Sequence, residues 1–382
     1  MKSSNASTQR VRSANALAIA VMLLGGCAMP DDRGPVDRRV MSVDEGRAFV
    51  RRLIPEAIPD RQAWAVDLYA AFLALDIPPS ASNVCAVIAV IEQESSFRTD
   101  PPVPGLPAIA SREIERQRES AGVPKLVLDA ALGLTSTNGK TYAERLQAVR
   151  TEQQLSEIFE DFIGRVPLGK TFLADRNPVR TGGPMQVSIA FAEAQTEGRG
   201  YPYPIGDSIR REVFTRRGGL YFGVAHLLDY PAPYPRPIYR FADFNAGRYA
   251  SRNAAFQQAV TEASGIPLEL DGDLLRYERG EPAREAGQTE IALRALASRL
   301  DLSIDDIRRD LRLEKGDRFE RTTLYQRVHA LAERQSGRPS TRAAMPRIPL
   351  KSPKITRKLT TEWFANRVNT RYETCLRRAA QG

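Results

Sequence analysis

The feature that most constrains the fold is a stretch from Val84 to Ile91 that consists only of valine, isoleucine, alanine and cysteine. A helix formed by these residues is apolar around its whole circumference, which is typical of a helix at the centre of a core. Apolar residues also recur at helical spacing from Arg61 to Asp76. Strand signals are scarce along the chain. We therefore expect a mainly α protein built around a helix that contains residues 84–91.

Local signals predict the bounds of several other helices. Ser42 and Glu45 form a capping box that opens a helix ending near Pro55, and Thr141 and Glu144 form another that leads a long polar helix. The C-terminal part contains three further expected helices and a loop: helices 288–300, 303–313 (capped by Ser303 and Asp306) and 360–378, and the loop 336–353.

The N-terminal segment indicates export. Lys2, Arg10 and Arg12 precede an apolar run, residues 14–24, which is shorter than the roughly 20 residues that a membrane-spanning helix needs. Leu24-Gly25-Gly26-Cys27 resembles the lipobox of bacterial lipoproteins, so we expect cleavage after residue 26 and a lipid on Cys27. Ala28 resembles the signal for retention in the outer membrane. The alternatives are an ordinary signal peptide and a single-pass anchor.

Charge and composition exclude several functional classes. The chain of 382 residues carries 55 Lys and Arg against 46 Asp and Glu, a net charge of +9. Loss of residues 1–26 removes three basic residues and leaves a net charge of +6. An exported protein meets phospholipid head groups and peptidoglycan carboxylates rather than nucleic acid. Three cysteines and two isolated histidines, His226 and His329, predict no disulfide scaffold, metal site or cofactor.

Two carboxylates at the end of the apolar stretch, Glu92 and Glu94, are candidates for chemistry. Partial burial raises the pKa of a carboxyl group and suits it to act as an acid near neutral pH. Such an acid can protonate a glycosidic oxygen. The helical pattern does not choose between Glu92 and Glu94, and both are also compatible with a solvated helix end.

Three ordered motifs resemble those of lytic transglycosylases with the goose-type lysozyme fold. Residues 76–79 followed by Ile91-Glu92-Gln93-Glu94-Ser95-Ser96-Phe97 are similar to the family's core helix, which ends in the catalytic Glu. Residues 182–187 (Gly-Gly-Pro-Met-Gln-Val) resemble its Gly-Leu-Met-Gln motif, and residues 242–247 (Ala-Asp-Phe-Asn-Ala-Gly) resemble its Ala-Tyr-Asn-Ala-Gly motif. Residues 219–228 resemble the helix between them.

The resemblance implies a role for each matched residue. Glu94 would be the catalytic acid and base, and Ser95, Met185, Gln186 and Asn245 would bind substrate. Each role has a simpler alternative: Ser95 and Asn245 also suit caps, and the glycines of the second motif also suit a turn. Phe97 is expected in the core, and His226 as a packed helix residue.

The chain departs from the family in three respects. Glu94 and Gly183 are 89 positions apart, so residues 98–182 contain an expected helical insertion that narrows substrate choice, recruits a cell-wall protein or closes the cleft. Pro184 replaces the usual Leu, and Phe244 replaces the usual Tyr. As a whole, the chain resembles a group of bacterial lipoproteins of unknown function.

The expected organisation follows from these observations: signal peptide 1–26, lipid-anchored tether 27–41, lysozyme-like domain 42–265 with its insertion, and helical C-terminal region 266–382. We expect a periplasm-facing lytic transglycosylase that acts on peptidoglycan. The alternatives are a lysozyme-like hydrolase, with Asp161, Asp175 or Asp243 as base, and a non-catalytic peptidoglycan-binding lipoprotein. Cys85 and Cys375 form either a disulfide or two buried thiols.

Overall fold

A computed structural model describes residues 41–165, 176–278, 280–350 and 359–381. The expected signal peptide, the lipidation site Cys27 and nearly all of the expected tether lie outside these ranges. Asp175 also lies outside them. Residues from Ser42 onward form one compact unit.

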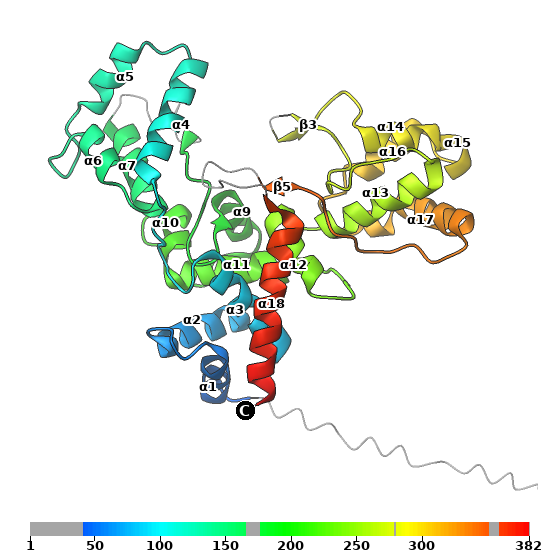
Figure 1. The fold of residues 1–382 in the computed structure, drawn as a ribbon, viewed down its shortest axis with the longest axis horizontal. Coiled ribbons are helices and arrows are strands. Elements are labelled where there is room, and N and C mark those ends of the chain that lie inside the picture. Colours follow the sequence, from blue (N-terminus) through cyan, green and yellow to red (C-terminus); the bar gives the residue numbers. More distant parts are fainter. Residues whose placement is uncertain (1–40, 166–175, 279, 351–358, 382) are drawn as a thin grey trace, which may run out of the picture. The chain divides into compact units, whose positions relative to one another are not determined.

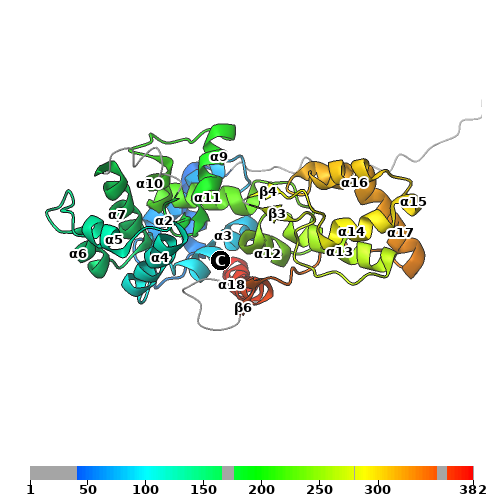
Figure 2. The ribbon, with the colours of Figure 1, turned by 90° about the horizontal axis from the view of Figure 1, so that it is seen from above.

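The described part is mainly α, as expected. It contains only three short antiparallel strand pairs: β1 with β2, β3 with β4, and β5 with β6. The helices and strands run in this order (Figures 1 and 2): α1 Val43–Leu53, α2 Arg61–Ala74, α3 Ala81–Glu94, α4 Leu106–Ser120, α5 Lys125–Leu132, α6 Tyr142–Ala148, α7 Glu152–Arg165, β1 Thr181–Gly182, β2 Val187–Ser188, α9 Ile189–Arg199, α10 Ile209–Phe214, α11 Arg216–Leu228, α12 Ile238–Ala246, α13 Ala250–Ser264, β3 Tyr277–Glu278, β4 Glu281–Pro282, α14 Gln288–Ala295, α15 Ala297–Leu300, α16 Ile304–Leu311, the 3-10 helix η2 Asp317–Arg321, α17 Thr323–Ser336, β5 Pro349–Leu350, β6 Leu359–Thr360 and α18 Thr361–Ala380.

Helix α3 lies at the centre of the first hydrophobic core. Every residue from Val84 to Ile91 is buried, which confirms the interpretation of the apolar stretch. Helices α1, α11 and α18 contact α3. Buried residues of this core come from helices between α1 and α12, with the exception of α5, and, after a long gap in sequence, from α18.

A second hydrophobic core is formed by α13 to α17 with the loop before α14. Phe256 and Val260 of α13 are fully buried in it. The expected domain boundary at residue 265 does not coincide with the division between the two cores. Helix α13, expected in the first domain, contributes to the second core, and α18, expected in the C-terminal region, contributes to the first. Local helical patterns gave the elements but not the core that each one joins.

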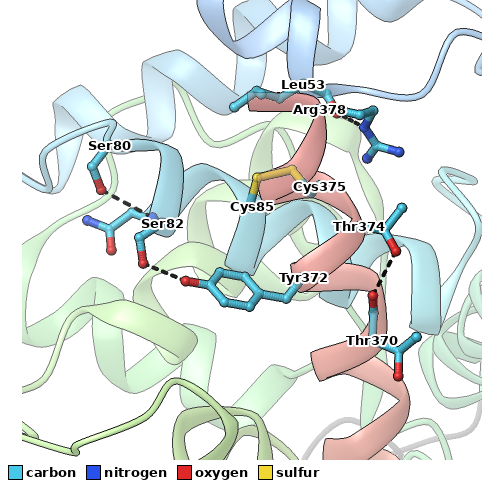
Figure 3. The surroundings of a disulfide bond; sticks show 10 residues. Leu53, Ser80, Ser82, Cys85, Thr370, Tyr372, Thr374, Cys375 and Arg378 are labelled. Atoms are coloured by element: carbon cyan, nitrogen blue, oxygen red, sulfur yellow. Dashed lines mark hydrogen bonds between the residues drawn. A yellow bond between two sulfur atoms is a disulfide. The ribbon is translucent and has the colours of Figure 1, made fainter. Parts of the chain in front are cut away.

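A disulfide between Cys85 and Cys375 joins α3 to α18 (Figure 3). It decides between the two interpretations that the sequence left open for this pair. The hydroxyl groups of Ser82 and Tyr372 lie 2.9 Å apart, and Arg378 Nε donates to the Leu53 carbonyl at 3.2 Å. The C-terminal helix is thus fixed to the central helix α3 by the disulfide and a hydrogen bond, and to α1 by a second hydrogen bond.

The described part of the expected insertion, residues 98–165 and 176–182, is helical and includes α4 to α7. The capping box of Thr141 and Glu144 is present. The expected long polar helix is not: α6 ends at Ala148 because Val149 is extended, and Thr151 Oγ1 accepts the Gln154 amide at the start of the next helix.

The other local predictions agree with the structure in most respects. The capping boxes at Ser42 and Ser303 are present, and the last helix begins one residue later than expected. The expected helix 288–300 is divided into α14 and α15 at Leu296. Across the described ranges, no helix combines the length and the apolar character needed to cross a bilayer.

Candidate active site

Glu94 is the last residue of α3 and is partly exposed. The chain turns sharply after it, because Ser96 and Phe97 both have positive φ, at 51° and 60°. Non-glycine residues in this region are uncommon and mark sites where the surrounding structure imposes the conformation. Ser95 is buried, and its hydroxyl donates to the Ile91 carbonyl at 3.1 Å. In the described structure Ser95 therefore acts as a helix cap, not as a residue that presents its hydroxyl to a ligand.

Phe97 fixes this turn to α2, as a core residue should. Its ring packs edge-on against Trp64 at 5.1 Å between centroids. The Arg216 guanidinium of α11 lies over the same Trp64 ring and pairs with Asp67 at 2.5 Å. The turn that follows Glu94 is thereby connected through α2 to α11.

The environments of Glu92 and Glu94 differ in a way that the helical pattern did not show. Burial raises the pKa of Glu92, and the guanidinium groups of Arg378 and Arg371 on α18 partly offset this effect. Glu92 therefore belongs electrostatically to the contact between α3 and α18. Glu94 stands at the end of α3, next to the constrained turn.

The second motif forms the loop of a tight hairpin between β1 and β2. Gly183 has φ of +72°, and a Cβ on it would lie 2.1 Å from the Val213 carbonyl oxygen. A Cβ on Gly223 of α11 would lie 2.3 Å from Met185 Sδ. The glycines therefore allow the hairpin loop to pack directly on α10 and α11.

This packing corrects the expected role of Met185. Its side chain is fully buried against Gly223, so it supports the loop and does not contact a ligand. Gln186 is partly exposed and has φ of 50°. Its amide accepts from the Thr181 hydroxyl and donates to the Gly183 carbonyl, both at 3.3 Å, so the side chain also orders its own loop.

The third motif lies at the C-terminal end of α12. Asn245 is exposed, and its Oδ1 accepts from Thr361 Oγ1 at 3.1 Å, which joins the last turn of α12 to the first turn of α18. Phe244 packs against the His226 ring of α11, with centroids 5.0 Å apart. Burial, helped by Arg248, lowers the pKa of His226 to about 4, so the neutral ring is a packed helix residue, as expected.

Of the three acidic residues considered as a hydrolytic base, the structure describes Asp161 and Asp243, and both are committed to other contacts. Asp243 is fully buried and accepts from Tyr230, Tyr234 and two backbone amides; burial raises its pKa, and these hydrogen bonds partly offset the effect. Asp161 pairs with Arg145 at 2.6 Å. Burial acts to raise the pKa of Asp161, but the hydrogen bonds from Thr137 and the charge of Arg145 outweigh it.

All three motif segments meet at α11. This helix contacts α3, β2 and α12, and it also contacts α2, which holds the turn after Glu94. The sequence showed α11 as a helix with small residues, but it did not show the contributions of Trp64, Asp67 and Arg216. No local signal identifies them, because their partners lie on other helices.

The described ranges contain no group of three or more His, Cys, Asp or Glu side chains arranged to hold a metal ion. At the end of α3, Glu94 presents a carboxyl group beside the constrained turn. A partly exposed carboxyl group of this kind can donate and accept a proton.

Comparison with known proteins places the chain in a family. The model of the family described as "Protein of unknown function (DUF1615)" matches residues 57–378. The chain belongs to this family. It is also 51% identical over 371 residues to the "Uncharacterized protein YaiW" of Escherichia coli (strain K12). The matched stretch covers 96% of this chain and 99% of that protein. No solved structure matches this DUF1615 chain.

Proposed function

We propose that this chain is a peptidoglycan lytic transglycosylase with a lysozyme-like catalytic core, in which Glu94 is the acid and base. The observation that carries the proposal is the meeting of three motif segments at one helix. Their order resembles that of goose-type transglycosylases, and α11 contacts the elements that bear all three. Met185 and Gln186 support the hairpin loop, and Asn245 supports the junction of α12 with α18.

The reaction needs one carboxyl group. Glu94 donates its proton to the β-1,4 glycosidic oxygen between N-acetylmuramic acid and N-acetylglucosamine, and the bond from that oxygen to C1 breaks. The Glu94 carboxylate then takes the proton of the muramyl 6-hydroxyl as this oxygen attacks C1. A 1,6-anhydro ring forms without water. Because Asp161 and Asp243 are held in other contacts, neither is available as the base that hydrolysis commonly uses.

The proposed setting is the periplasmic face of the outer membrane, with a lipid on Cys27. The disulfide between Cys85 and Cys375 supports export, because such bonds persist in oxidising compartments. The proposed partner is then the glycan strands of peptidoglycan, and nucleic acid is not a proposed partner. The net charge of +6 after removal of residues 1–26 suits a carboxylate-bearing polymer.

Digestion of purified sacculi, followed by mass spectrometry of the muropeptides, tests this function. Wild-type protein should release 1,6-anhydro products, and Glu94→Gln should lower their yield at least about a hundredfold, the usual scale of general acid-base catalysis. Glu92→Gln is the matched control and should leave the yield unchanged. It removes the same carboxylate chemistry from the same helix, but Glu92 lies near Arg371 and Arg378 of α18 rather than at the turn after α3. Ordinary reducing ends would indicate a hydrolase, and equal yields from wild type and Glu94→Gln would exclude Glu94 as the catalyst.

A further inference from the structure

Helices α4 to α7 enclose a pocket that the proposed catalytic reaction does not use. It has a volume of about 160 Å³. Glu113, Gln117, Arg176 and Pro178 form a minor part of its lining. The main part consists of apolar and aromatic side chains from all four helices: Ile114, Leu128, Leu132, Tyr142, Leu146, Leu155, Ile158, Phe159 and Phe162. An engineered apolar cavity of about 150 Å³ in another protein holds benzene, so this pocket has room for about six carbon atoms.

Helix α7 lines the pocket with Leu155, Ile158, Phe159 and Phe162. The span from Leu155 to Phe162 covers about 10 Å along a helix axis. A ligand of about 160 Å³ that contacts this whole stretch of α7 is extended along the helix. A linear chain of methylene groups makes this contact better than a ring does.

Helix α5 covers this pocket loosely. None of its residues is buried, although Leu128 and Leu132 line the pocket. Leu126 and Val127 are 80% and 55% exposed on its outer side. Gly122, with φ of +67°, and Gly133 stand just outside its two ends. An apolar helix that is held by few contacts and bounded by glycines can move to admit a ligand.

One cationic group stands at the edge of the pocket. Arg176 is exposed, and it forms no hydrogen bond or ion pair with any other residue that the structure describes. The acidic group of the lining, Glu113, already accepts hydrogen bonds from Arg116 and Gln117. An anion bound at Arg176 therefore meets a carboxylate whose charge is already compensated.

We propose that this pocket binds an anionic amphiphile, with a linear acyl chain along α7 and its carboxylate or phosphate group at Arg176. The chain length in contact with the protein is about six to eight carbons, set by the volume of the pocket and by the length of α7 that lines it. The exposed apolar side of α5 provides the entry side. The site lies within residues 98–182, and it is independent of the proposed chemistry at Glu94.

Calorimetric titration with a series of fatty acids tests the chain. The titration uses a secreted form of the protein that begins at residue 28 and carries no lipid, so that no detergent is needed. This form keeps the pocket, because residues 42–382 contain both hydrophobic cores and the disulfide in one compact unit. From butanoate to octanoate, the affinity should rise about fourfold per methylene. Beyond octanoate, the increase should stop. An affinity that does not depend on chain length, or an absence of octanoate binding at millimolar concentration, would overturn the proposal.

Variants of the pocket test the two ends of the ligand separately. Arg176→Gln should weaken octanoate and octyl phosphate about tenfold while leaving 1-octanol unchanged, and Arg112→Gln, an exposed arginine of α4 outside the pocket, should change none of them. The tighter of the two anions identifies the head group as that of a fatty acid or that of a phospholipid. Equal loss for octanol and octanoate in Arg176→Gln would refute recognition of an anion.

Filling the pocket separates ligand binding from folding. Ile114→Phe should weaken all three octyl compounds at least tenfold and raise the melting temperature, because the added ring occupies the space of the ligand. If this variant is less stable, Arg176→Gln still decides the question. Toluene binding as tightly as octanoate would refute the acyl chain and indicate an aromatic side chain of a partner protein.

Discussion

The disulfide should contribute a large share of the stability of the first core. Cys85 and Cys375 are 290 positions apart and both are fully buried. In the chain-entropy relation, closing a loop of that length in the unfolded chain is worth about 5 to 6 kcal/mol at 25 °C. This free energy depends only logarithmically on loop length. If the second core stayed folded while the first unfolded, the flexible loop would be shorter by about a third, and the contribution of the disulfide would change by less than about 0.5 kcal/mol.

Urea unfolding followed by circular dichroism measures this contribution. The paired variant Cys85→Ala/Cys375→Ala should lose roughly 4 to 6 kcal/mol, since measured effects often fall below the entropic value. Wild-type protein in reductant is the control, because it loses the cross-link and keeps both sulfur atoms. Unfolding midpoints that agree in oxidised and reduced wild-type protein would show that the bond does not constrain the unfolded chain, and would refute the argument.

Two further predictions concern single side chains. Gly183→Ala should cost at least about 2 kcal/mol, because its Cβ meets the Val213 carbonyl oxygen and φ is positive, whereas Gly198→Ala in α9, where a Cβ meets nothing within 4 Å, should stabilise by about 0.5–1 kcal/mol. Similar urea midpoints for the two variants would contradict this. Burial raises the pKa of Glu314 from 4.5 to about 7, so the folded state retains a proton that the unfolded state releases. Stability should therefore fall by up to about 3 kcal/mol as the pH rises from 4.5 through 7, and Glu314→Gln should flatten the dependence of the urea midpoint on pH.

The sequence predicted what short-range rules determine. The apolar stretch before Glu92 identified the central helix, and the three capping boxes placed helix starts correctly. The end of the helix after Thr141 was missed, because the chain stops it with an extended residue and a new cap instead of glycine or proline. The packing of the C-terminal helix α18 on the central helix α3 was missed for a different reason. An amphipathic pattern shows that α18 has an apolar side, but it does not show that α3 covers that side.

The candidate site shows the same division. Glu94 followed from an ordered set of motifs, whereas the distinction between Glu92 and Glu94 depends on Arg371 and Arg378 of α18, which are 279 and 286 positions from Glu92. Met185 belonged to a matched motif, yet its neighbour Gly223 determines that it is buried. A residue that matches a motif can therefore be assigned to ligand binding or to internal packing only when the residues that contact it in the fold are known.

The second core interrupts the first in sequence. Helix α12 ends just before this interruption and α18 follows it, and the side chains of Asn245 and Thr361 on these two helices hydrogen bond at 3.1 Å. Exit and return points that lie together are the geometry in which an inserted unit leaves its host core undisturbed. The family match runs through the second core as well as through residues 98–182, and the relative from Escherichia coli covers 96% of this chain. The proposed pocket among α4 to α7 gives residues 98–182 a specific binding activity to test.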